Sequence, residues 1–176
     1  MVVNGFITNE KGGGTMITKD DYAKMLSGEH EIMLNQTDGL THEDSLIQPQ
    51  PGGNCLNWVM GHLVENLVEI LNILGGDLPP DLPDLSHYGY GSEPIHGDEA
   101  GVINLQVLMN AYGRLTKGIT DRLDRMMESD FDEEIDFWQG QARRGYVAFF
   151  YFFHHSYHLG QLEQLRNLAG RTEKVI

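Results

Sequence analysis

The spacing of hydrophobic residues along the chain predicts four long helices separated by turn-rich connections. The expected ranges are about 18–37, 54–75, 102–127 and 143–169. In each range apolar residues recur three and four positions apart, which gathers them on one face of a helix. No strong alternating pattern of the β-strand type occurs, although residues 131–138 could form a short extended segment. The pattern therefore predicts an all-α fold.

Residues at the ends of these ranges support the assignment. Thr18 is followed three positions later by Asp21, an acceptable N-terminal cap, and Asn54 is a natural cap for the second helix. Gly170 follows the last range and is a good C-terminal signal. Gly28 weakens the middle of the first helix.

The connection over residues 76–98 is long and cannot be helical throughout, because it holds Pro79, Pro80, Pro83 and Pro94. A helix of ~20 residues is about 30 Å long, and a linker of this size could span roughly twice that distance. The segment is therefore long enough to let the second and third helices run parallel. It is either a lid or binding loop, or simply a strap across the helices.

Length and composition limit the class of protein. The 176 residues, 40% of them hydrophobic, are most simply one domain at residues 16–176, preceded by a flexible leader at residues 1–15. The longest apolar run, residues 146–153, is far too short to cross a bilayer, so no membrane insertion is expected. The first residues lack the features of a signal peptide.

The charge balance and the cysteine content add two expectations. The formal net charge of −14 repels phosphate backbones and anionic membranes, which argues against nucleic acid as a partner. The single cysteine, Cys55, cannot form an internal disulfide, which fits a reducing compartment and a cytoplasmic location.

Three histidines, His154, His155 and His158, end the apolar run near the C-terminus, where the helix is expected to be buried on most sides. On a helix, His154 and His158 stand one turn apart, the spacing at which two imidazoles can share a metal ion. The alternative is a pair of buried histidines with hydrogen-bond partners and no metal, and the spacing alone does not decide between the two. His155 lies about 100° round the helix; it could replace His154 as a ligand, or support the site or lie at the surface.

A mononuclear site needs at least a third protein ligand. His62 is the best candidate, because it flanks the buried stripe of the second helix and follows Gly61, which permits a close helix approach. A purely structural role for His62 stays open. The remaining candidates are His30, in a polar setting, His42, and His87 and His96 in the long connection.

Other metal chemistries are excluded or weakened by spacing. Zinc proteases use His-Glu-x-x-His, and the residue after His154 is not glutamate. Di-iron bundles use Glu-x-x-His, and Tyr151 occupies the position three before His154. Cys55 lies two turns from His62, roughly 10 Å along the helix axis, and is expected to be a small buried residue.

Two sequence blocks resemble the DinB-like superfamily, which includes the DinB and YfiT-like proteins. The first, residues 54–63, reads NCLNWVMGHL, and the second, residues 154–162, reads HHSYHLGQL. The resemblance extends over nearly all of residues 16–170. By position, His62, His154 and His158 match the metal triad of the family. Leu159 stands where the family usually has arginine, so an ion pair or substrate contact made by that arginine is not expected here.

The resemblance implies a four-helix bundle with up-down-down-up order and a long crossover between helices 2 and 3, often assembled as a homodimer. It implies a zinc, nickel or iron ion held by the three histidines. Characterised relatives include transferases and isomerases that use small-molecule thiols, so the expected activity is that of a metal-dependent thiol transferase or hydrolase acting on a small substrate. Glu65 and Tyr157 are weak candidates for a general base. The alternative is a non-catalytic, stress-associated or ligand-binding helical bundle with a structural metal or none.

Overall fold

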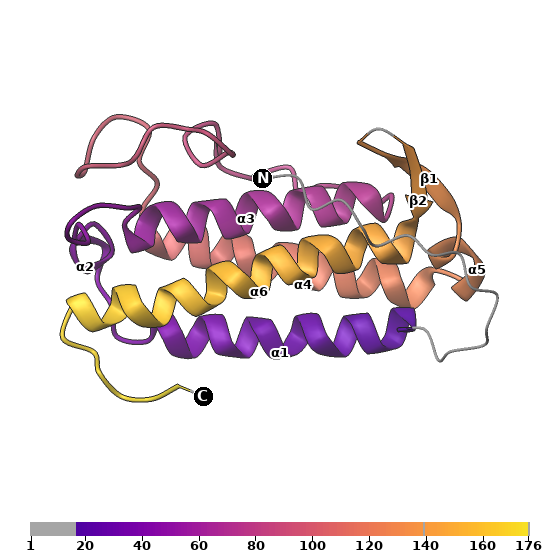
Figure 1. Ribbon diagram of the computed structural model, residues 1–176, viewed down its shortest axis with the longest axis horizontal. Coiled ribbons are helices and arrows are strands. Elements are labelled where there is room, and N and C mark those ends of the chain that lie inside the picture. Colours follow the sequence, from indigo (N-terminus) through magenta and orange to yellow (C-terminus); the bar gives the residue numbers. More distant parts are fainter. Residues whose placement is uncertain (1–16, 139, 176) are drawn as a thin grey trace.

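The computed structural model describes residues 17–138 and 140–175, and this part of the chain is mostly helical, as predicted. Four long helices lie side by side (Figure 1). They are α1 (Lys19–Thr37), α3 (Leu56–Ile73), α4 (Leu105–Arg125) and α6 (Arg144–Leu168). The short elements are the helices α2 (His42–Ser45) and α5 (Glu128–Phe131) and the strands β1 (Glu134–Phe137) and β2 (Gly140–Arg143). The leader expected at residues 1–15 lies outside the described residues.

Local capping explains several helix ends. The Thr18 hydroxyl accepts a hydrogen bond from the Asp21 N–H at 3.1 Å, and the Asp21 carboxylate accepts from the Thr18 N–H at 3.2 Å. This reciprocal pair satisfies two donors that a helix start otherwise leaves unpaired. The predicted cap Asn54 is wrong, because α3 has Cys55 at that position and no side-chain cap bond. Packing holds the start of α3, since every residue of 56–64 is buried.

Each long helix packs against two others. Helix α1 contacts α4 and α6, and α3 contacts the same two helices. Asn57, near the start of α3, donates to the Ile103 carbonyl just before α4, and Arg122, near the end of α4, donates to the Leu74 carbonyl just after α3. The starts of α3 and α4 therefore lie together, as do their ends. The apolar core fills the space between these helices.

The connection between α3 and α4 is fastened to α3 by Tyr88. Its ring is fully buried against Gly61, where a Cβ atom would lie only 2.0 Å from Tyr88 Cδ1. The Tyr88 hydroxyl donates to Asn57 Oδ1 at 3.0 Å and accepts from the Ile103 N–H at 2.8 Å. Gly61 thus permits a close approach, as predicted, but the partner is this connection and not another helix.

A small β-hairpin departs from the predicted all-α fold. Strands β1 and β2 pair antiparallel, and the positive φ of 50° at Trp138 belongs to their turn. The rings of Phe137 and Trp138 contact Phe150 of α6, so aromatic packing attaches the hairpin to the helices. The extended segment allowed for residues 131–138 is present only in its second half, because Phe131 ends α5.

Helix α6 is less enclosed than its sequence suggests. The expectation that residues 146–153 are buried on most sides is wrong: Tyr146, Phe149 and Phe153 are exposed, Phe153 to 68%. The reason is that α6 packs mainly against α1 and α3, and none of the other described helices covers its outer side. Among the residues that the structure describes, no helix has the length and hydropathy that crossing a membrane requires.

Candidate metal centre

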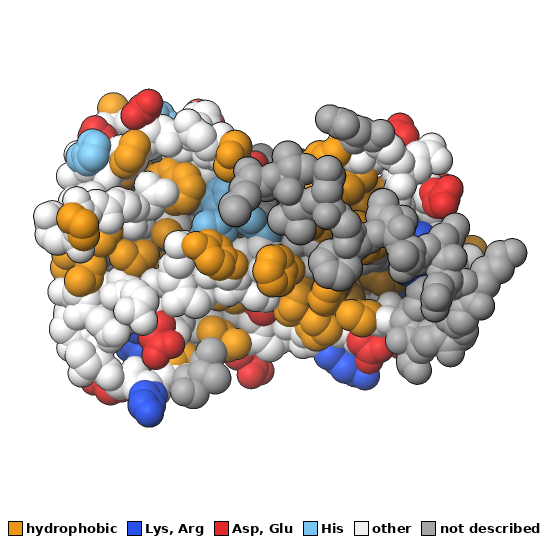
Figure 2. All heavy atoms as spheres, viewed as in Figure 1, with side chains coloured by type: hydrophobic (Ala, Val, Ile, Leu, Met, Phe, Trp, Pro, Cys, Tyr) orange, Lys and Arg blue, Asp and Glu red, His pale blue; other side chains and the backbone are white. Residues whose placement is uncertain are grey.

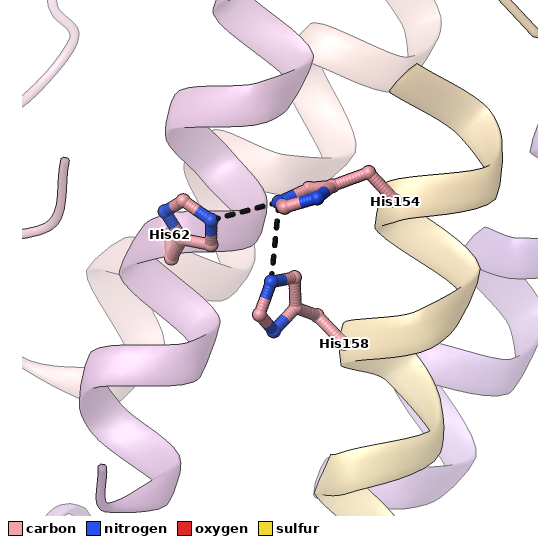
Figure 3. A group of neighbouring side chains, drawn as sticks. All are labelled: His62, His154 and His158. Carbon is pink, nitrogen blue, oxygen red and sulfur yellow. Dashed lines mark hydrogen bonds between the residues drawn. The ribbon is translucent and has the colours of Figure 1, made fainter. Parts of the chain in front are cut away.

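Three histidines converge between α3 and α6 (Figure 3). His62 projects from α3, and His154 and His158 project from successive turns of α6. The Nε2 atom of His154 lies 3.0 Å from Nε2 of His62 and 3.1 Å from Nε2 of His158. One nitrogen from each ring lies within 4.8 Å of the others, a group that can hold a metal ion. Two nitrogens bound to one tetrahedral zinc ion lie about 3.3 Å apart, so these spacings fit such an ion.

The two outer imidazoles are oriented by hydrogen bonds at their other nitrogen. Nδ1 of His62 lies 2.8 Å from the Tyr88 carbonyl oxygen, and Nδ1 of His158 lies 2.7 Å from Gln161 Oε1. Because both partners are acceptors, each Nδ1 carries the proton. A neutral imidazole protonated at Nδ1 presents a lone pair at Nε2, the form that binds a metal ion.

Counting protons shows that the group fits a cation. His154 Nε2 takes part in both short contacts, yet a neutral imidazole has at most one hydrogen on that atom. One of the two contacts therefore brings two lone pairs together with no proton between them. A positive ion bound by the three nitrogens removes this repulsion. Three imidazoles joined only by hydrogen bonds to one another would keep it.

Burial keeps the three rings neutral. It is the main cause that lowers the pKa of His62, of His154 and of His158, and the neighbouring imidazoles lower each pKa further. At neutral pH the lone pairs are thus available to a metal ion. His62 is buried, while His154 and His158 are partly exposed, so the group opens toward solvent on one side. Figure 2 shows histidine surface near the middle of one face, over α3 and α6, with hydrophobic side chains beside it.

Neighbouring side chains hold His62 in place. The Trp58 ring stacks on the imidazole with centroids 4.9 Å apart, and its Nε1–H donates to Ser92 Oγ in the connection at 3.0 Å. Asn66 Nδ2 lies 3.3 Å from His62 Nε2 and donates to the His62 carbonyl. The Oδ1 atom of Asn66 is buried and has no hydrogen-bond partner. A buried acceptor of this kind is costly unless a bound molecule donates to it.

His155 does not belong to the group, and the expectation of a surface position is wrong. Its ring is fully buried on the side of α6 that faces α4, where Nε2 lies 2.7 Å from the Tyr112 hydroxyl. Burial lowers its pKa to about 3, so the ring is neutral in the folded protein. Leu159 is buried one turn further along α6, a position that suits its apolar side chain.

The other candidate ligands lie elsewhere. His30 packs beside the Tyr112 ring, and His42 Nδ1 accepts a hydrogen bond from the Leu105 N–H. His87 and His96 are exposed in the connection. Within the described residues the metal-competent group thus contains three side chains and no fourth histidine, cysteine or carboxylate.

The groups that orient the imidazoles, Gln161 and the Tyr88 carbonyl, were not among the residues predicted from the sequence. Gln161 follows His158 by three residues, so helical spacing was a sufficient signal for it. The Tyr88 carbonyl gives no such signal, because a backbone acceptor carries no mark in the sequence. Of the two candidate bases, Glu65 Oε2 lies 3.7 Å from His62 Nδ1, and Tyr157 is exposed beside the His158 ring.

Comparison with known proteins identifies the family. A DinB-like protein from Bacillus cereus ATCC 10987 matches with a TM-score of 0.69 at 18% identity, over 89% of this chain and 95% of the other. A conserved protein from Enterococcus faecalis matches with a TM-score of 0.63 at 18% identity, over 88% and 98%. No curated protein sequence matches significantly. The DinB superfamily matches residues 25–162, which include all three converging histidines. The chain belongs to the DinB superfamily.

Proposed function

We propose that this protein binds one divalent metal ion through His62, His154 and His158 and acts as a metal-dependent thiol transferase or hydrolase. The observation that carries the proposal is the convergence of three Nε2 lone pairs, two of them fixed by acceptors at Nδ1. Three protein ligands leave coordination positions for water or substrate, which is the pattern of catalytic sites; structural zinc sites usually have four.

The chain supplies binding and orientation. A zinc, nickel or iron ion held there supplies Lewis acidity, which makes a nearby thiol or water molecule a stronger acid. The Asn66 amide, whose Nδ2 lies 3.3 Å from His62 Nε2, adds a polar group beside the proposed ion.

The same family membership underlies two proposals about architecture. The four long helices form an up-down-down-up bundle, which is supported by the contacts that bring the starts of α3 and α4 together. The protein is a homodimer. Phe149, Phe153 and Tyr157 support this, because they are exposed four residues apart along the outer side of α6.

Metal analysis tests the binding site. Untagged protein, its three single variants His62→Ala, His154→Ala and His158→Ala, and the control His96→Ala are to be titrated with Zn²⁺, Ni²⁺ and Fe²⁺ by calorimetry, and bound metal is to be measured by mass spectrometry. We expect each triad variant to lose roughly tenfold or more in affinity, while His96→Ala keeps the wild-type value. Full occupancy in all three triad variants would contradict the proposed ligands.

Turnover tests the reaction class separately. Metal-loaded protein is to be incubated with glutathione, bacillithiol or mycothiol and an electrophilic acceptor, and with activated esters and amides for hydrolysis. We expect metal-dependent turnover that His154→Ala removes. A protein that binds metal through the triad and turns over none of these combinations would favour the non-catalytic alternative, a ligand-binding helical bundle.

A further inference from the structure

A cavity of about 390 Å³ lies between α1 and α6, away from the three histidines. Its apolar wall consists of Met25 and Ile32 from α1 and Phe152 and Leu159 from α6. On α6, Ser156 lines the cavity and stands about 200° round the helix from His154. The cavity and the metal-competent group therefore occupy opposite sides of the same helix. Its volume falls in the range of small-molecule sites.

Two glycines create the space. Gly28 of α1 and Gly160 of α6 both line the cavity, and a Cβ atom built on either has no neighbour within 4 Å. Neither has a positive φ, so neither backbone requires glycine. A glycine inside a helix destabilises it by about 1 kcal/mol relative to alanine. Alanine fits at both positions, so close helix packing does not account for these glycines, and both positions border open space.

Two residues that line the cavity, Glu29 and Gln36, each have one buried oxygen atom without a hydrogen-bond partner among the described residues. Glu29 is 5% exposed, and in the described part of the chain its Oε2 has no hydrogen-bond partner, while Oε1 accepts from the Ser156 hydroxyl. Gln36, two turns further along α1, is 1% exposed, and its Oε1 is also unpartnered. Leaving such atoms unpaired costs about 1–3 kcal/mol each. A ligand that donates hydrogen bonds removes this cost.

The charges around the cavity indicate which charge a bound ligand would carry. Among the described residues its ionisable lining side chains are Glu29 and Glu163, both acidic, and no lysine or arginine lines it. The chain as a whole carries a formal net charge of −14. An anion would therefore be repelled, and a neutral donor would bind more weakly than a cationic one, because it lacks the Coulomb attraction of an ion pair. A cationic donor on an apolar skeleton matches the acceptors, the charges and the wall.

We propose that the cavity between α1 and α6 is a binding site for a small organic amine, whose ammonium group donates to Glu29 and whose apolar part packs between the two helices. The Gln36 amide takes part in binding the polar end of a longer amine that reaches it. Burial raises the pKa of Glu29 to about 8, so an ammonium ion that pairs with this carboxyl also favours its ionised form. This site is independent of the metal proposal.

Calorimetry with a matched set of probes tests the site. Full-length protein is to be titrated with phenethylamine, with its neutral analogue 2-phenylethanol and with the anion 3-phenylpropionate. We expect the amine to bind at least roughly tenfold more tightly than the alcohol, and the anion not to bind. The isosteric variant Glu29→Gln is expected to remove this preference, and Gly160→Leu, which fills the cavity, to abolish binding. His154→Ala is expected to bind the amine as the wild type does.

Each contrary result overturns the proposal. Equal affinity for amine and alcohol, or an unchanged preference in Glu29→Gln, contradicts recognition by the carboxyl. Loss of amine binding in His154→Ala assigns it to the metal-competent group. If the Gly160→Leu variant fails to fold, chemical-shift mapping of the wild type with phenethylamine locates the site instead. The amides that the amine perturbs must then lie on the facing sides of α1 and α6. A Gly160→Leu variant that only changes the oligomeric state indicates that a second copy of the chain covers the cavity.

Discussion

At the scale of single residues, Glu29 has the most unusual setting. A carboxyl group 95% removed from solvent, with one oxygen unpaired, is destabilised whenever it is ionised. Its pKa is raised to about 8 from 4.5, chiefly by burial. Because the folded pKa lies above the unfolded value, the folded state binds the proton more tightly. The contribution of this protonation to the free energy of unfolding is fully present below about pH 4.5 and is lost as the pH rises toward 8.

Replacing Glu29 by glutamine removes this pH dependence. We expect Glu29→Gln to be more stable than the wild type at pH 8, by roughly 3–5 kcal/mol from the size of the pKa shift. The difference should shrink as the pH falls and vanish near pH 4.5. Urea unfolding at several pH values measures it, with Glu163→Gln, a half-buried acid on the facing helix, as the control. Parallel stability profiles for wild type and Glu29→Gln would contradict the assignment.

Single site residues could be predicted from the sequence only where their relation to one another is local, within a turn or two of one helix. His154 and His158 were found as a pair because their relation is one helical turn. His62 was only the best of several candidates from its own surroundings, since 92 residues separate it from His154 and the fold brings the two together. The unpartnered oxygen of Glu29 could not be predicted, because it depends on which helices face that side of α1.

At the scale of elements, the connection between α3 and α4 contributes to the metal-competent group through one backbone atom. The Tyr88 carbonyl fixes His62 Nδ1, and the Tyr88 ring is seated on Gly61. The four long helices followed from local periodicity and capping, and their ends lie within a few residues of the predicted positions. The course of the connection could not be predicted from local patterns, because it depends on contacts between residues distant in sequence, such as Tyr88 and Asn57.

Substituting Gly61 by alanine should displace the connection. The added Cβ would lie 2.0 Å from the Tyr88 ring, so Tyr88 must move and His62 loses its acceptor. We expect destabilisation by about 1–3 kcal/mol and a roughly 10–100-fold loss of metal affinity. Gly28→Ala is the matched control; it meets no neighbour, should stabilise by about 0.5–1 kcal/mol and should leave metal affinity unchanged. Unaltered metal binding in Gly61→Ala would show that the carbonyl is dispensable.

At the scale of the whole molecule, the main surface feature is the row of exposed aromatic rings on the outer side of α6. Several exposed apolar residues, one after another along one face of a helix, are typical of surfaces that a partner covers in an assembly. The apolar composition of residues 146–153 predicted a buried position, because composition measures apolar character and does not say how many helices surround a given one. Among the described elements α6 has two main helix neighbours, and no third long helix covers its outer side.

The proposed homodimer predicts the consequence of placing a charge in that row. Phe153→Lys should shift the protein from dimer to monomer in sedimentation equilibrium, because an unpaired charge would be buried in the contact. Tyr90→Lys is the control, since Tyr90 is 97% exposed and lies in the connection. A wild-type protein that is monomeric at all concentrations, or a Phe153→Lys variant that remains dimeric, would contradict a dimer formed by this surface.

Helix α6 leaves little freedom for insertion or deletion. Around its circumference it presents His154 and His158 to α3, His155 to α4, and Ser156 to the cavity beside α1. Losing one residue from the first turns of the helix would rotate everything after it by about 100°. The histidine group, the buried hydrogen bond to Tyr112 and the cavity wall would then be lost together. Insertions and deletions are therefore expected in the hairpin and in the connection between α3 and α4. They are not expected in the first half of α6.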